Sequence, residues 1–195
     1  MLRKPTWGTC AGLILLAESA NRTKKGGQEL IGGLDVRVNR NHFGRQTESF
    51  QANLDLPFLH SPDVKDSDTK LNPFRAIFIR APIVEKLLPV VGGRQEGEVA
   101  VDETVVAPSK PIDTEAVKDF HLGDVEVLGV LPGRSAALDE ATRERLDAEA
   151  GDIIAVRQAN VFGTSFHPEL TGDPRIHVWW LEQVISEVDQ RRHAQ

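Results

Sequence analysis

The chain has 195 residues, of which 40% are hydrophobic and 27% charged, with a formal net charge of −6. These ordinary proportions argue against global disorder, and the length predicts one domain over residues 1–195. The acidic balance disfavours non-specific nucleic-acid binding, and no apolar run reaches the length of a membrane span. A single cysteine cannot form an intrachain disulfide and fits a reducing compartment, so we expect a cytoplasmic protein.

The only cysteine, Cys10, lies in a Gly-Thr-Cys-Ala-Gly segment with the G-x-C-x-G frame of a nucleophile elbow. Residues 4–7 can end a strand, and the apolar run after the elbow predicts a helix over 13–18 or 13–20. We expect both flanking glycines to be required, because a Cβ on either side would clash, and the helix N-terminus to favour the thiolate. The alternative is a buried structural cysteine.

The following elements alternate between strands and loops. Residues 34–38 alternate apolar and charged side chains, which predicts a strand with one solvated face. Further strands are expected over 49–56, 75–80, 125–131, 152–158 and 161–166, the last two forming a hairpin. Surface loops are predicted over 21–27 and 57–73, and the polar, glycine-rich residues 92–124 are interpreted as a flexible insertion.

Two helices are predicted in the C-terminal part. The first is a short solvated helix over 136–151, to which we assign no function. The second is a closing helix over 176–192 whose apolar residues have helical spacing, which favours core packing over a ligand site; they are Ile176, Trp179, Trp180, Val184, Ile185 and Val188.

His167 and Glu169 follow the predicted strand over 161–166. A thiol nucleophile needs a base, and the base needs an orienting carboxylate. Pro168 restricts the pair, and residues two apart on an extended backbone point the same way, so Glu169 could bind one ring nitrogen while the other faces Cys10. The alternative is a surface histidine beside a solvated glutamate.

Together these segments resemble class I, triad-type glutamine amidotransferases, and within that class the glutaminase subunits of pyridoxal 5'-phosphate synthase (the Pdx2/SNO/PdxT family). The resemblance extends over residues 5–185. It rests on five blocks: Gly8–Ala17, Arg40–Gln46 followed by Glu48-Ser49-Phe50, Phe78–Pro82, Thr164–Thr171 and Asp173–His177. It implies an α/β fold: a three-layer mixed sheet with helices on both faces, as in flavodoxin-like proteins.

The resemblance also implies roles for individual residues. Cys10 would attack the glutamine amide, His167 would act as base and then acid, and Glu169 would orient His167. Arg40, Ile79 and Arg80 would bind glutamine, and an arginine fork suits its α-carboxylate. Without the resemblance, Arg40 reads as an ordinary surface arginine. Arg80, between apolar residues, is more suggestive of a role in binding, and its alternative is a structural arginine that caps a carbonyl.

The chain departs from the family pattern before the elbow, where the family has strands, helices and a Gly-Gly loop that completes the oxyanion hole. Because Cys10 lies within ten residues of Met1, we expect a glutamine amidotransferase domain that is incomplete at the N-terminus. The N–H of Ala11 is then the remaining oxyanion donor.

The resulting hypothesis is a glutaminase that hydrolyses L-glutamine and supplies ammonia to a Pdx1/SNZ-like synthase subunit for vitamin B6 synthesis. No metal or bound cofactor is implied, and the histidines outside the motif show no metal-ligand spacing. The alternatives are a glutaminase serving another synthase and a catalytically inactive module that docks on the synthase.

Overall fold

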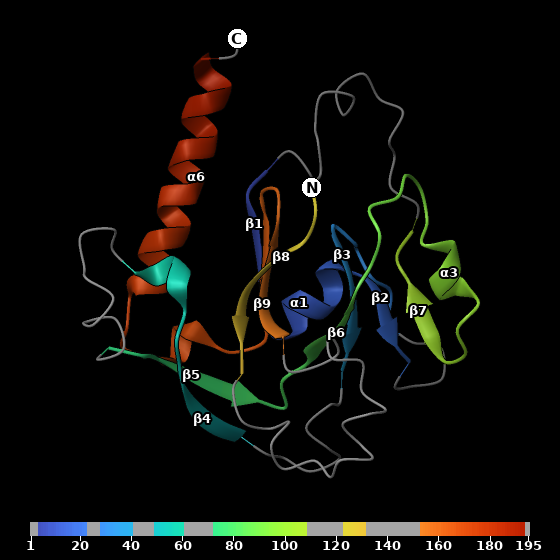
Figure 1. Ribbon diagram of the computed structural model, residues 1–195, viewed down its shortest axis with the longest axis horizontal. Coiled ribbons are helices and arrows are strands. Elements are labelled where there is room, and N and C mark those ends of the chain that lie inside the picture. The colour runs from blue at the N-terminus through green and yellow to red at the C-terminus, as the bar shows by residue number, and fades with distance from the viewer. Residues whose placement is uncertain are drawn as a thin grey trace.

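The computed structural model describes residues 4–22, 28–40, 49–60, 72–108, 123–131 and 153–193. Its elements are β1 (Thr6–Thr9), α1 (Ala11–Leu16), β2 (Ala17–Asn21), β3 (Leu34–Asn39), β4 (Ser49–Leu54), η1 (Pro57–Leu59), β5 (Phe74–Ile79), β6 (Ile83–Leu87), α3 (Glu96–Val99), β7 (Thr104–Val106), β8 (Glu126–Val130), β9 (Ile153–Gln158), β10 (Val161–Thr164), η3 (Pro168–Leu170) and α6 (Arg175–His193). The main sheet has the order β1-β10-β9-β6-β3-β2-β7, with β8 also paired to β9, and β4 and β5 form a separate ribbon (Figure 1).

The main sheet is mixed and has an apolar core on each face. Successive residues of a strand point to opposite faces, and in β10 Val161 belongs to one core cluster and Phe162 to the other. The α1 residues Leu13 and Leu16 pack in the first cluster, whereas Ile176 of α6 packs in the second together with residues of β4 and β5. The predicted α/β class, a mixed sheet with helices on both faces, is confirmed.

The elbow helix is shorter than predicted. It ends at Leu16, and Ala17–Asn21 forms β2, which pairs in parallel with β3 and antiparallel with β7. Ala17 and Ala20 are both fully buried in this strand. A run of apolar and small residues suits a helix or a buried strand equally, and here two strand neighbours decide the outcome.

The predicted strand over 34–38 is confirmed as β3, but neither of its faces is solvated. Asp35 is fully buried, and Arg37 is bonded to Glu98 at 2.7 Å. The segment that covers this polar face comes from residues 92–108, which we expected to be part of a flexible insertion. Residues 92–108 instead contribute the helix α3 and the strand β7, which pairs antiparallel with β2 in the main sheet (Figure 1). Residues 109–122 lie outside the described part of the chain.

The C-terminal elements agree largely with the prediction. β9 and β10 form the expected hairpin, turning at Ala159, which has a φ of 51°. The closing helix is α6, but it packs in the core mainly through its first turns: Ile185 is 59% exposed and Val188 38%. The helix predicted over 136–151 falls outside the described residues. None of the described helices combines the length and apolar character that crossing a bilayer requires.

Candidate functional site

Cys10 occupies the sharp turn between β1 and α1. Its backbone has φ 47° and ψ −104°, a conformation that a residue other than glycine adopts only when the surrounding structure imposes it. The constraint comes from the sheet: β1 pairs in parallel with β10, and the Cys10 N–H donates to the Thr164 carbonyl at 2.7 Å. The predicted elbow geometry is therefore present.

The two glycines of the elbow do not have the same role. A Cβ at Gly8 would lie 2.5 Å from the carbonyl carbon of Gly12 and 2.6 Å from Leu16 Cδ1, so α1 can pack on β1 only if residue 8 has no side chain. A Cβ at Gly12 would meet nothing within 4 Å. The expectation that both positions need glycine is thus wrong for Gly12.

The surroundings of the Cys10 thiol change its pKa in the direction that disfavours the thiolate. Burial raises the pKa of Cys10 above its ordinary value, and the negative charge of Glu169 raises it further. A hydrogen bond from the Ala11 N–H and the charge of Arg80 lower the pKa without overcoming burial. The predicted thiolate-favouring effect at the start of α1 is therefore outweighed by the partial desolvation of the thiol.

His167 and Glu169 form the expected pair, with His167 Nδ1 2.7 Å from Glu169 Oε1. The backbone conformation that produces this contact differs from the prediction, because Pro168–Leu170 forms a 3-10 turn rather than an extended chain. The backbone N–H of His167 donates to the Ile77 carbonyl at 2.8 Å, which anchors the turn beside β5. One imidazole nitrogen is thereby occupied by the carboxylate, which leaves Nε2 for another partner.

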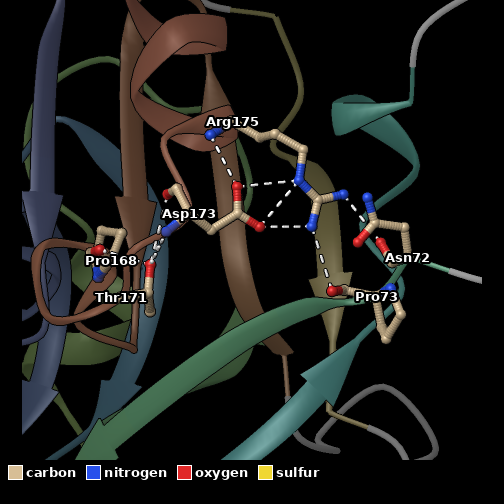
Figure 2. Close-up of polar contacts among 6 residues, drawn as sticks. All are labelled: Asn72, Pro73, Pro168, Thr171, Asp173 and Arg175. Atoms are coloured by element: carbon tan, nitrogen blue, oxygen red, sulfur yellow. Dashed lines mark hydrogen bonds and ion pairs between the residues drawn. The ribbon is translucent and has the colours of Figure 1, made fainter.

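Further polar contacts connect the 3-10 turn to the start of α6 and to the chain before β5 (Figure 2). Thr171 Oγ1 donates to the Pro168 carbonyl at 3.0 Å, and Asp173 accepts from the Arg175 guanidinium at 2.9 Å. Arg175 also donates to the Asn72 carbonyl at 2.9 Å, just before β5. The turn carrying Glu169, the start of α6 and the start of β5 are thus joined, and the sequence reasoning assigned no role to Asp173 or Arg175.

The end of β5 reaches the elbow. The Cys10 thiol lies 3.8 Å from the Ile79 carbonyl oxygen, a hydrogen-bond contact for sulfur. Arg80, which follows, has a φ of 46°, and its charge acts on the thiol. The structure therefore brings Ile79 and Arg80 to Cys10. Both Cys10 and Arg80 have a positive φ, so the backbone is strained on both sides of this contact.

Arg40 follows β3, where Asn39 pairs with Ile83 of β6. That register aligns Arg40 with the chain just after Arg80. The Arg40 side chain is only 9% exposed; its guanidinium donates to the Gln28 carbonyl at 3.2 Å, and its Nε has no partner within the described residues. Burial lowers the pKa of Arg40. A buried guanidinium with a free donor is unusual and suits an anionic ligand group.

Cys10, the His167–Glu169 pair, Arg40 and Arg80 thus come from four separate segments of the chain, and the charges of Glu169 and Arg80 both act on the Cys10 thiol. A thiol within reach of an imidazole–carboxylate pair can carry out acyl transfer. Among the described residues, no group of three potential metal ligands occurs.

Comparisons with known proteins find a matching family model, several relatives and a similar solved structure. The model of the SNO glutamine amidotransferase family matches residues 2–121 and 129–186. The chain is 36% identical over 187 residues to the "Probable pyridoxal 5'-phosphate synthase subunit PDX2" of Arabidopsis thaliana, covering 96% of this chain and 60% of that protein. It is 34% identical over 187 residues to the pyridoxal 5'-phosphate synthase subunit PdxT of Pseudarthrobacter chlorophenolicus, covering 94% of this chain and 63% of that protein.

Among solved structures, a crystal structure of a glutamine amidotransferase matches with a TM-score of 0.50 and 30% sequence identity. The match covers 91% of this chain and 59% of the other. The chain thus spans about three fifths of the length of the relatives that it matches.

Proposed function

Because the chain belongs to the SNO glutamine amidotransferase family, we propose that it hydrolyses L-glutamine to glutamate and ammonia, with Cys10 as nucleophile and His167 as base. The observation that carries this proposal is the His167–Glu169 contact of 2.7 Å, on a turn that follows the strand bonded to Cys10. A carboxylate on Nδ1 sets the tautomer so that Nε2 can accept a proton.

The raised pKa of Cys10 makes the base necessary. His167 Nε2 takes the thiol proton as sulfur attacks the side-chain carbonyl carbon of glutamine, which forms a tetrahedral oxyanion facing the Ala11 N–H. The imidazolium then protonates the departing nitrogen, so ammonia leaves and a glutamyl thioester remains. Water, deprotonated by His167, attacks the thioester and releases glutamate and the free thiol.

The two arginines and Ile79 would bind the substrate. Arg40 Nε, which has no partner within the described residues, suits the α-carboxylate of glutamine, because a guanidinium offers that group a planar pair of donors. Ile79 and Arg80 would hold the substrate side chain over the thiol, since the Ile79 carbonyl already contacts the sulfur.

We further propose that the ammonia passes to a partner synthase subunit that builds pyridoxal 5'-phosphate, as the names of the two relatives suggest. In this proposal the protein resides in the cytoplasm with its partner. A second candidate is docking on that synthase without catalysis; the raised pKa of the partly buried Cys10 thiol favours it.

The deciding experiment measures ammonia release from L-glutamine with the synthase subunit present. Cys10→Ala should reduce turnover to background. Glu169→Gln should reduce kcat by about 10²-fold or more, because His167 loses its orienting carboxylate. Glu187→Gln, on the outer part of α6, is the matched control and should leave kcat unchanged. Binding to the synthase with no turnover that depends on Cys10 would leave only the docking function.

A further inference from the structure

The side chains of Asp35 and Gln158 connect β3 to β9, two strands whose backbones are not paired with each other. In the sheet order β6 lies between β3 and β9, but its register with β9 is a single pair, Val84 with Ile153. At the far end of β9, Gln158 Oε1 instead accepts from the Asp35 N–H of β3 at 2.8 Å. Gln158 Nε2 donates to Asp35 Oδ2, also at 2.8 Å. The Gln158 amide thus replaces a missing strand contact.

Gln95 completes this connection. Its Nε2 donates to Asp35 Oδ1 at 3.0 Å and to the Pro89 carbonyl at 2.8 Å, while Gln158 Nε2 also donates to the Gly123 carbonyl at 2.9 Å. Each carboxylate oxygen of Asp35 therefore receives an amide N–H, and both amide groups use both of their hydrogens. All three side chains are at most 4% exposed. A buried, satisfied network of this kind tolerates little displacement of its members.

The two strands that this network joins lead to different halves of the candidate site. β3 ends at Asn39 and is followed directly by Arg40. β9 turns into β10, whose last residue, Thr164, accepts the Cys10 N–H and precedes His167 by three positions. The position of β3 relative to the β9–β10 hairpin therefore sets the position of Arg40 relative to the thiol.

We propose that Asp35, Gln95 and Gln158, the amide clamp, are positioning residues that fix Arg40 at the working distance from Cys10 and His167. This inference rests on the proposed glutaminase function. The clamp acts through the backbone, because within the described residues none of its three side chains is a hydrogen-bond partner of Arg40 or of the Cys10 thiol. The α-carboxylate and the reacting amide are the two ends of one small substrate. A displacement of Arg40 relative to Cys10 by about 1 Å can therefore cost about 10²-fold in productive binding.

The test compares two reagents for Cys10 on the full chain by intact-mass spectrometry. Iodoacetamide reports the thiol alone, whereas 6-diazo-5-oxo-L-norleucine, which carries the α-amino and α-carboxylate groups of glutamine, also requires Arg40. The rate of labelling by the glutamine analogue divided by the rate of labelling by iodoacetamide is therefore a ratio that isolates substrate positioning. Gln158→Glu sets a carboxylate against Asp35, and we expect the ratio to fall about 10-fold or more. The exposed Gln190→Glu on α6, whose side chain bonds Ser186, is the matched control and should not change the ratio.

Exchanging the carboxylate and the amide between positions 35 and 158 tests the hydrogen bond between these two side chains. The double variant Asp35→Asn with Gln158→Glu keeps an amide-to-carboxylate hydrogen bond between the two positions, so the ratio should recover toward that of the wild type. A purely structural role would change the thermal midpoint of the variants without changing the ratio.

The possible outcomes distinguish a failure of the proposed glutaminase function from a failure of the amide clamp alone. A wild type that reacts with iodoacetamide but not with the glutamine analogue refutes the proposed function, and the clamp with it. A wild type labelled by both reagents, with an unchanged ratio in folded Gln158→Glu, overturns the clamp alone. If Gln158→Glu does not fold at the assay temperature, the nearly isosteric Asp35→Asn decides in the same way: a reduced ratio supports the clamp and an unchanged ratio overturns it.

Discussion

The close packing of α1 on β1 makes Gly8→Ala the sharpest test of the elbow. The new Cβ would lie 2.5 Å from the Gly12 carbonyl carbon and 2.6 Å from its oxygen. Carbon atoms pack best at about 3.5–4.0 Å, so α1 would have to move about 1 Å away from β1. Leu13 and Leu16, which anchor α1 in the core, would lose part of their contacts. We expect a loss of about 1–3 kcal/mol in the free energy of unfolding, the usual cost of overpacking.

Gly12→Ala is the matched control, because it adds the same atom on the other side of Cys10 into open space. Alanine is the better helix former by up to about 1 kcal/mol, so this variant should be unchanged or slightly more stable. Urea unfolding followed by tryptophan fluorescence measures both, since Trp7 lies beside Gly8 on β1. Cys10 alkylation should change only in Gly8→Ala, where the elbow is distorted. Equal stability and equal alkylation of the two variants would refute the reasoning.

Three further predictions concern charged groups. Because burial raises the pKa of Cys10, its rate of alkylation by iodoacetamide should still be rising above about pH 8.5, where free cysteine is half ionised; a plateau below that pH would contradict the raised pKa. Arg80→Gln removes a charge that lowers the pKa of Cys10, so the profile should move to higher pH, and a shift the other way would exclude that contact. The hydrogen bond from Arg175 lowers the pKa of Asp173, so this carboxylate stabilises the fold above its unfolded pKa, and the contribution is lost as pH falls through the lower folded pKa. Asp173→Asn should therefore cost about 1 kcal/mol at pH 7 in urea unfolding, with the difference from the wild type closing below about pH 4; a gap independent of pH would count against it.

Much of the fold could be read from local patterns. The β9–β10 hairpin, β3, β5 and α6 were predicted because their apolar periodicity and turn residues agree with their final environment. The prediction failed where sheet neighbours override local preference. Ala17–Asn21 reads as the continuation of a helix and becomes β2, and the charged side of β3 reads as solvated although α3 covers it. Nothing in the local pattern of residues 92–108 indicates that this segment packs on β3.

The sequence alone determined which chemistry the chain could carry. Cys10 in its elbow frame and the His167-Pro168-Glu169 run specify residue types and a spacing that suit acyl transfer, and both can be read directly along the chain. Only the tertiary structure decided how those groups behave. The pKa of Cys10 depends on how much water the fold removes from the sulfur, and the burial of the Arg40 guanidinium depends on what packs around it. Burial and the distance between remote segments are sums over the whole packed molecule, so no local pattern contains them.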